Sequence, residues 1–207
     1  MFKNIIFDWS GVVKDALPQS IWVVTKMMQE LGGKEIPLAE FQENWVQPYM
    51  KFWNKYFPNL DLETEQKMYH ETLAREDCPK TGACPGMAEL IKALKNNGLF
   101  LAVVSSDHPR TLLPEIMEYD LENVFNEVVT NVYDKTEGAK GIIEKSHLKK
   151  EETVIIGDSN HEVEIGKHLG IKTIAVTWGF STEKNLKALN PDYLVHNVKE
   201  LEKILLK

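Results

Sequence analysis

Residues 4–11 read NIIFDWSG, a strand-like apolar run that ends in an acid and a turn glycine. The run 4–7 is short and apolar, as in the buried strands of parallel sheets. Asp8 follows it directly, and Gly11 permits a tight turn shortly afterwards. Because ligands of open α/β sheets bind at the carboxyl ends of the strands, we expect Asp8 to face a crevice. Its carboxylate is a candidate nucleophile, since it is already charged at neutral pH.

A second acidic segment follows another strand-like run. The run 153–156 continues into GDSNHE at positions 157–162, which contains Asp158 and Glu162. Strands of one parallel sheet end at the same edge, so we expect both carboxylates near Asp8. Magnesium takes oxygen ligands and keeps space for phosphate oxygens. The three acids therefore predict a Mg²⁺ cofactor and phosphoryl transfer through an aspartyl-phosphate on Asp8.

Strand-like and helical patterns alternate through most of the chain. The five strand-like runs lie at residues 5–7, 99–104, 128–129, 154–156 and 171–176. Helical patterns lie between the later runs, and Thr136 and Glu137 are candidate caps for one of them. This alternation predicts an α/β fold, a Rossmann-like parallel sheet flanked by helices. We assign residues 1–13 and 85–207 to this core domain.

The segment 14–84 breaks the alternation. It has helical patterns, many aromatic residues, and glycine and proline punctuation at Gly32-Gly33, Pro37 and Pro58. We interpret it as an inserted all-helical cap domain. A cap over the strand ends would exclude water from the site and carry substrate-selecting side chains, although most of its aromatic residues are expected to pack its own helices.

The composition narrows the class of protein. A chain of 207 residues with 43% hydrophobic residues can bury a proper core. The net charge is −7 and no dense block of Lys and Arg occurs, so a nucleic-acid partner is not expected. No apolar stretch approaches the roughly 20 residues of a membrane helix, so no membrane partner is expected, and no signal-peptide pattern opens the chain. Two cysteines without disulfide or zinc spacing favour a cytoplasmic protein, and the oligomeric state is left open.

Four segments, in order, resemble the motifs of the haloacid dehalogenase superfamily. They are residues 8–13, 101–105, 133–136 and 157–162, and the similarity continues through 175–180 and 191–193. The resemblance covers essentially all of the chain, and it is to the phosphatase and phosphonatase branch with an inserted helical cap. It implies a hydrolase whose partner is a small phosphorylated metabolite.

The resemblance also implies a set of metal ligands. Asp8 and Asp158 would bind Mg²⁺ directly, and Glu162 would bind it directly or through water. The backbone carbonyl of Ser10 would be a further ligand. Glu162 departs from the usual aspartate, and its alternative role is that of a negative charge at a helix N-terminus.

Phosphate binding would fall to residues of the first three motifs. Ser105 would donate its hydroxyl to a phosphate oxygen, with Ser106 as a competitor for that role. Lys135 would neutralise charge on the phosphoryl oxygens and on Asp8, with Lys140 as the alternative lysine. The candidate catalytic residues are Asp8, Ser10, Ser105 and Lys135, and the candidate phosphate-binding residues are Ser10, Gly11, Ser105, Ser106 and Lys135.

Ser10 is the main departure from the family pattern. Related phosphatases usually place an aspartate there, which protonates the leaving alcohol and then activates water. Such assistance is worth about 10²–10⁴-fold in rate, so its loss should lower the rate of hydrolysis unless another group supplies it. We predict Mg²⁺-dependent hydrolysis of a small phosphorylated metabolite. The alternatives are C–P bond cleavage like that of phosphonoacetaldehyde hydrolases, for which Lys51 and Lys55 are the candidate Schiff-base lysines, and a catalytically weak phosphometabolite-binding protein.

Overall fold

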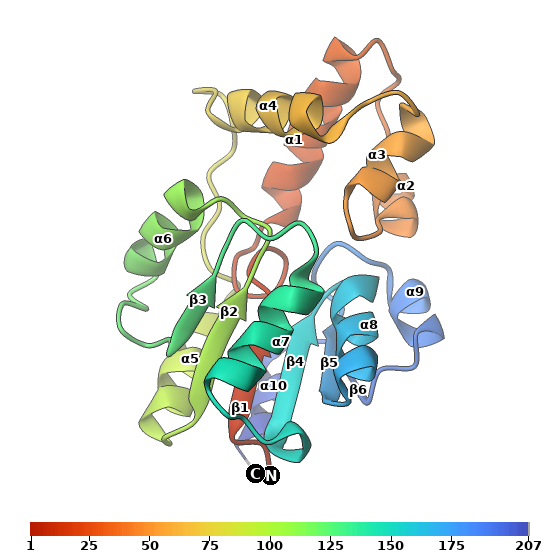
Figure 1. Cartoon of the computed structure of the whole chain (residues 1–207). Coiled ribbons are helices and arrows are strands. Elements are labelled where there is room, and N and C mark those ends of the chain that lie inside the picture. Colours follow the sequence, from red (N-terminus) through yellow and green to blue (C-terminus); the bar gives the residue numbers. More distant parts are fainter. Residues whose placement is uncertain (207) are drawn as a thin grey trace.

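Six parallel strands form the sheet at the centre of the computed structural model, which describes residues 1–206. The strands are β1 (Asn4–Phe7), β2 (Phe100–Val104), β3 (Glu127–Val129), β4 (Thr153–Gly157), β5 (Lys172–Val176) and β6 (Tyr193–Val195). Their order across the sheet is β3-β2-β1-β4-β5-β6 (Figure 1). In β1, Phe7 is aligned with Val103 of β2 on one side and with Ile156 of β4 on the other. The chain order reverses at β1, so the residues that follow β1 and β4 meet at the carboxyl edge of the sheet.

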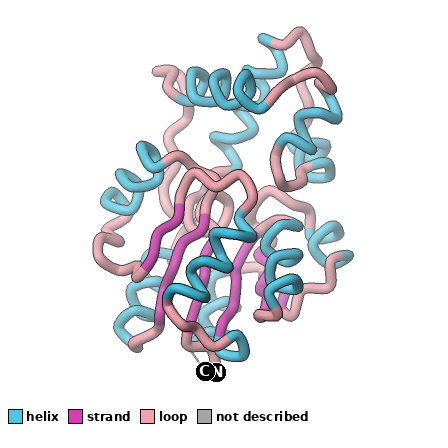
Figure 2. Tube along the Cα trace, in the orientation of Figure 1, coloured by secondary structure: helices cyan, strands magenta, loops and turns pink. Residues whose placement is uncertain are grey.

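Helices cover both faces of the sheet (Figure 2). One face carries α5 (Met87–Asn96), α6 (Pro109–Glu118) and α10 (Val198–Leu205), and the other carries α7 (Lys135–Lys145) and α8 (Asn160–Leu169). Side chains of β1 alternate between the two layers, with Ile5 and Phe7 in the first and Ile6 in the second. The short α9 (Glu183–Ala188) packs through Leu186 beside α8 and β5, and a 3₁₀ turn (Lys150–Glu152) precedes β4. The sheet is therefore buried on both faces, and its carboxyl edge is left for the site.

Four helices lie between β1 and α5, beyond the carboxyl edge of the sheet (Figure 1). They are α1 (Leu17–Glu30), α2 (Leu38–Asn44), α3 (Met50–Tyr56) and α4 (Leu62–Leu73). These helices share an apolar cluster, to which Phe180 of the loop after β5 also belongs. The chain enters and leaves them through adjacent connections, because Lys14 forms a β-bridge with Ala83, and the Cys84 N–H donates to the Val13 carbonyl at 2.8 Å. On this basis we propose that residues 14–84 act as a cap domain on a core of residues 1–13 and 85–207.

The expected α/β class and the flanked parallel sheet are confirmed, with two differences in detail. The strand β6 was not expected, because it has only three residues at the edge of the sheet and begins with the exposed Tyr193. The helix α7 begins at Lys135, and Asp134 is its N-cap, accepting from the Thr136 N–H at 2.9 Å. Thr136 and Glu137 therefore lie inside the helix that they were expected to cap. Within residues 1–206, no helix combines the length and the apolar character needed to span a membrane.

Candidate active site

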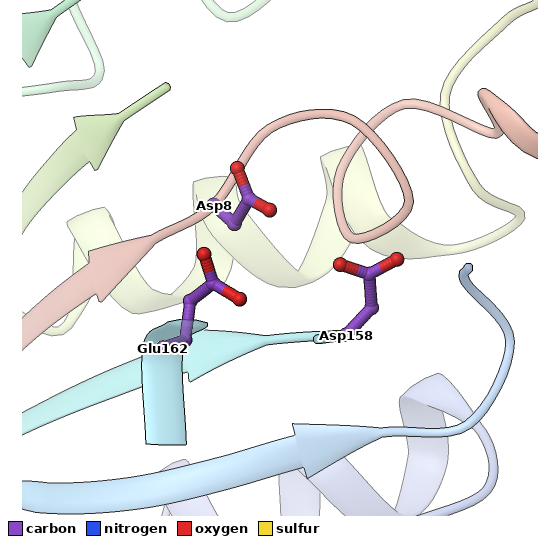
Figure 3. A group of neighbouring side chains, drawn as sticks. All are labelled: Asp8, Asp158 and Glu162. Atoms are coloured by element: carbon purple, nitrogen blue, oxygen red, sulfur yellow. The ribbon is translucent and has the colours of Figure 1, made fainter. Parts of the chain in front are cut away.

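Three buried carboxylates meet at the carboxyl edge of the sheet (Figure 3). Asp8 follows β1, Asp158 follows β4, and Glu162 lies in the first turn of α8. One oxygen of each carboxylate lies within 4.8 Å of the others, and each residue is at most 4% exposed. The fold thus brings together three acids that are up to 154 positions apart in the sequence (162 − 8 = 154).

Lys135 is the cation of this cluster. Its Nζ lies 2.7 Å from Asp8 Oδ1 and 2.9 Å from Glu162 Oε1, and the side chain is 2% exposed. Lys140 has a half-exposed side chain that pairs with Glu137 at 3.7 Å. The structure therefore places Lys135 beside the carboxylates and Lys140 on the surface of α7.

Burial and mutual repulsion shift the pKa values of the cluster. Burial is the largest cause that raises the pKa of Asp8 and of Asp158, and Glu162 raises both further. For Lys135, burial alone would lower the pKa, but the neighbouring carboxylates outweigh it and raise the pKa. For Glu162, burial alone would raise the pKa, but Lys135 outweighs it and lowers the pKa. Lys135 therefore offsets one negative charge, and two remain when all three acids are ionised.

This donor set fits a hard divalent cation. It consists of carboxylate oxygens in a buried cluster with an excess of negative charge, which is the environment that Mg²⁺ prefers. Asp158 is held in place, because its Oδ2 accepts the Phe180 N–H at 2.6 Å. Both oxygens of Glu162 are engaged, Oε1 by Lys135 and Oε2 by the Ser159 hydroxyl at 2.8 Å. This engagement favours contact of Glu162 with a cation through water.

Two glycines make room for Asp158. Gly11 has a φ of +87°, and a Cβ at this position would lie 2.2 Å from Asp158 Oδ2. A Cβ at Gly179 would lie 2.0 Å from the same oxygen. The Gly11 N–H already donates to the Lys14 carbonyl at 2.9 Å. We therefore expect Gly11 to serve the site by leaving space rather than by donating a hydrogen bond to phosphate.

The loop after β2 adds polar groups to the same cleft. Ser105 is buried and Ser106 is half-buried, and both line the cleft together with Asp8. The Ser10 hydroxyl donates a hydrogen bond to Asp107 Oδ2 at 2.7 Å. The Asp107 N–H in turn donates to Ser105 Oγ at 3.0 Å. A carboxylate therefore lies beside Ser10, although position 10 itself carries none.

Asp107 lies beside the four motifs and is not among the predicted catalytic, phosphate-binding or metal-binding residues. It lies two positions after Ser105, in the sequence SSD that follows an apolar run. That spacing resembles the one between Asp8 and Ser10, where a polar residue three positions after a strand end faces the same crevice. This similarity is the signal that could have identified Asp107.

The cleft extends from the carboxylates to the cap helices. It contains about 1040 Å³ of empty space, part of it open to solvent. The cap side chains that line it include those of Trp45, Gln47, Tyr49, Trp53, Glu65 and Tyr69. Within the described chain, the lysines that line it are Lys14 and Lys135, and Lys14 pairs with Glu115 at 2.5 Å. Lys51 and Lys55, the candidate Schiff-base lysines, line a separate hollow.

The fold and the cleft together define an α/β enzyme with an acidic site at the switch point of its sheet. Residues 5–176 match the family model of haloacid dehalogenase-like hydrolases. The match spans well over half of the chain, so the protein belongs to this family.

Relatives narrow the class of reaction. Phosphoglycolate phosphatase of Synechococcus elongatus is 23% identical over 204 residues, covering 96% of this chain and 95% of the relative. Pyrophosphatase PpaX of Halalkalibacterium halodurans is 28% identical over 121 residues, or 56% of each chain. The protein is therefore a phosphatase-type hydrolase of the haloacid dehalogenase family.

Solved structures agree with the fold. A structure of a predicted phosphatase from Clostridium acetobutylicum aligns with a TM-score of 0.86 at 20% identity, covering 100% of this chain and 99% of that one. A haloacid dehalogenase-like family protein from Streptococcus pneumoniae aligns with a TM-score of 0.77 at 18% identity, covering 97% and 96%. The likeness extends over the cap helices as well as the sheet.

Proposed function

We propose that the protein is a magnesium-dependent phosphatase that hydrolyses a small phosphorylated metabolite through an aspartyl-phosphate on Asp8. The observation that carries the proposal is the contact of Asp8 with Lys135 at 2.7 Å, beside two further buried carboxylates in one cleft. Without a cation, three buried carboxylates would repel phosphate. A protein that only bound phosphate would therefore gain nothing from them, whereas a carboxylate nucleophile with a metal site needs them.

Several side chains of the cleft each have a role in the first step. Asp8 attacks phosphorus and forms an acyl phosphate while the bond from phosphorus to the leaving oxygen breaks. Lys135 offsets the charge on the equatorial phosphoryl oxygens. Ser105 and Ser106 donate hydroxyl hydrogen bonds to the non-bridging oxygens. Gly11 keeps the turn after β1 clear of Asp158.

The metal ligands follow from the same geometry. Asp8, Asp158 and the backbone carbonyl of Ser10 would hold Mg²⁺ directly, and Glu162 would contact it through water. When bound, the ion supplies positive charge to the phosphoryl oxygens and offsets the repulsion among the carboxylates.

Asp107 supplies the carboxyl group that position 10 lacks. In the first step, protonated Asp107 passes its proton to the leaving oxygen, directly or through the Ser10 hydroxyl. In the second step, the Asp107 carboxylate accepts a proton from the water that attacks phosphorus. The products are inorganic phosphate and the restored carboxylate of Asp8.

The cap and the relatives suggest where to look for the substrate. Residues 14–84 would shield the acyl phosphate from bulk water and contact the part of the substrate that leaves. The names of the relatives make phosphoglycolate and pyrophosphate two compounds to test first.

Phosphate release with magnesium and with chelator tests the proposal. We expect Mg²⁺-dependent release from p-nitrophenyl phosphate and from small phosphomonoesters. Asp8→Asn should lower the rate by about 10³-fold or more, because the nucleophile is lost. Asp15→Asn is the matched control, since Asp15 is exposed and does not line the cleft.

Two results would contradict the proposal. Full activity of a folded Asp8→Asn protein would exclude Asp8 as the nucleophile. Release confined to phosphonoacetaldehyde would favour C–P cleavage instead, and a lysine other than Lys51 and Lys55 would then have to form the Schiff base.

A further inference from the structure

Glu65 is a buried carboxylic acid in the cap half of the cleft. It lies on α4, is 3% exposed, and lines the same cleft as Asp8. Among the described residues it forms no ion pair, in contrast to Lys14 and Lys135 at the other end of the cleft. The Trp53 side chain lies close enough to lower the pKa of the Glu65 carboxyl group, but burial outweighs this effect. A buried carboxyl group without a cation is costly, so it needs a compensating partner or a function.

Aromatic side chains surround this acid. Tyr49, Trp53 and Tyr69 line the cleft with it, and so does Trp45. Burial raises the pKa of Tyr69, and the negative charges of Asp107 and then Glu65 raise it further, so Tyr69 lies near both acids. Burial and Glu65 also raise the pKa of Tyr49. Aromatic faces beside a carboxylate attract a cation both through their ring quadrupoles and through the negative charge.

The charges of the cleft point to the same ligand. Lys135 is paired with Asp8 and Glu162, and Lys14 with Glu115, so neither lysine that lines the cleft is left to neutralise Glu65. Burial raises the pKa of Glu65 to about 7, which is the response of a carboxyl group that has no cation. The Oε1 atom of the buried Gln47, which also lines the cleft, has no donor among the described residues. A positively charged hydrogen-bond donor would satisfy the Glu65 carboxylate.

We propose that Glu65, with the aromatic side chains of Tyr49, Trp53 and Tyr69, forms a subsite for the ammonium group of a phosphorylated amino alcohol. This inference rests on the proposed function, because it takes from it that the phosphoryl group of the substrate binds at Asp8 and Lys135. The substrate then carries its negative end at the carboxyl edge of the sheet and its positive end in the cap. A second anionic group on the substrate, such as the carboxylate of phosphoglycolate or the second phosphate of pyrophosphate, would meet Glu65 and be repelled, so on this inference both compounds are poorer substrates than a phosphorylated amino alcohol.

Binding of non-hydrolysable phosphonates to the native protein tests the subsite without relying on turnover. Aminopropylphosphonate and aminobutylphosphonate each have an alkylphosphonate counterpart in which a methyl group replaces the ammonium group. Calorimetric titrations with magnesium at about pH 8, where Glu65 is ionised, give the dissociation constants. We expect at least one ammonium compound to bind about tenfold or more tightly than its alkyl counterpart.

Two variants assign the preference to Glu65. Glu65→Gln keeps the shape of the side chain and removes its charge, so the preference should fall to about twofold or less. Glu71→Gln is the matched control, because Glu71 lies on the same helix with an exposed side chain, and it should keep the native preference. Unfolding curves of both variants check that they are folded.

The binding results that would overturn the ammonium subsite are separate from the results that would contradict the proposed function. Dissociation constants within twofold for both pairs on the native protein would overturn it, and so would a preference that survives in Glu65→Gln. These results do not depend on whether p-nitrophenyl phosphate is hydrolysed. Loss of hydrolysis would contradict the proposed function, while an intact ammonium preference would still support the subsite.

Discussion

At the scale of single residues, Ser10 and Asp107 lie 97 positions apart and share one hydrogen bond of 2.7 Å. The backbone of Asp107 is held from two sides, because its N–H donates to Ser105 Oγ and its carbonyl accepts the Asn131 N–H at 2.8 Å. The carboxylate is therefore positioned before any substrate binds, which lowers the reorganisation needed in the transition state. The short serine side chain at position 10 leaves space for it.

A substitution at Asp107 should separate substrates by their leaving groups. Asp107→Asn should lower kcat/KM for an alkyl phosphate about 10²-fold, because an alkoxide leaves poorly without a proton. For p-nitrophenyl phosphate, kcat/KM should change by less than about threefold, because this leaving group is stable as an anion. Phosphate release from both esters is the measurement.

Asp15→Asn serves as the control for the loss of one negative charge near the site. An equal fall in kcat/KM for both esters would mean that Asp107 holds the loop in place and does not transfer a proton. If kcat/KM changes for neither ester, Asp107 has no role in the mechanism.

At the scale of helices and strands, the strand ends and the helices of 14–84 were predictable, but the faces that these helices turn toward the site were not. Asp8 and Asp158 follow apolar runs, and the rule that parallel strands end at one edge places them together without further information. The helical pattern of 14–84 also predicts helices. It does not predict which face of each helix looks toward the sheet, because that depends on how the helices pack on one another. Glu65 reads as an ordinary polar residue of α4, and only the packed cap makes it a buried acid.

A loop after β5 forms part of the contact between the core and the cap. Phe180 belongs to the apolar cluster of the cap helices, and its ring centroid lies 5.0 Å from that of Trp45 and 6.0 Å from that of Phe41. The same residue donates its N–H to Asp158, so one position serves both the cap and the acidic cluster. Cap docking and site geometry are therefore joined through Phe180.

Truncating this side chain should weaken the whole molecule. Phe180→Ala should lower the free energy of unfolding by about 3 kcal/mol, since a buried aromatic ring is replaced by a cavity. Urea unfolding followed by tryptophan fluorescence measures it. Met117→Ala is the control, because Met117 is 62% exposed and its truncation should cost less than about 0.5 kcal/mol. A change at Phe180 no larger than that of the control would mean that the cap does not depend on this contact.

At the scale of the whole molecule, the acidic cluster that provides the candidate active site also lowers the stability of the fold. Three buried carboxylates share one lysine, so their repulsion destabilises the fold when no divalent cation is present. Asp158→Asn removes one of these charges and keeps an oxygen for the Phe180 N–H. In chelator, we expect this variant to unfold at a higher temperature than the native protein. Its free energy of unfolding should be larger by about 1–2 kcal/mol.

Magnesium should reverse that order. It should stabilise the native protein by about 2.7 kcal/mol at a hundredfold excess over its dissociation constant, and the variant by much less. Thermal unfolding of both proteins with and without magnesium is the measurement, with Asp15→Asn as the control. Equal stabilisation of all three proteins by magnesium would mean that the ion binds elsewhere.

Glu65 should make the stability of the whole protein depend on pH. The pKa of this side chain is about 7 in the folded protein, above its ordinary value of 4.5, because burial disfavours the charged form. Below about pH 4.5 both the folded and the unfolded chain keep the proton, so the shift contributes nothing. Between about pH 4.5 and pH 7 the unfolded chain loses the proton first, so stability falls as the pH rises, and above about pH 7 the full loss persists.

Glu65→Gln should abolish this contribution. The tyrosines beside Glu65, Tyr49, Tyr69 and Tyr133, have pKa values raised further above their ordinary range and stay neutral over this interval. The gain in free energy of unfolding from Glu65→Gln should therefore be larger at pH 8 than at pH 5 by up to about 3 kcal/mol. Urea unfolding of both proteins at the two pH values measures the difference. If an ammonium ligand of the cleft is added at pH 8, the difference should shrink, because the ligand then supplies the cation that the buried carboxylate lacks. A gain that is the same at both pH values would mean that Glu65 titrates normally in the folded protein and faces water rather than a buried subsite.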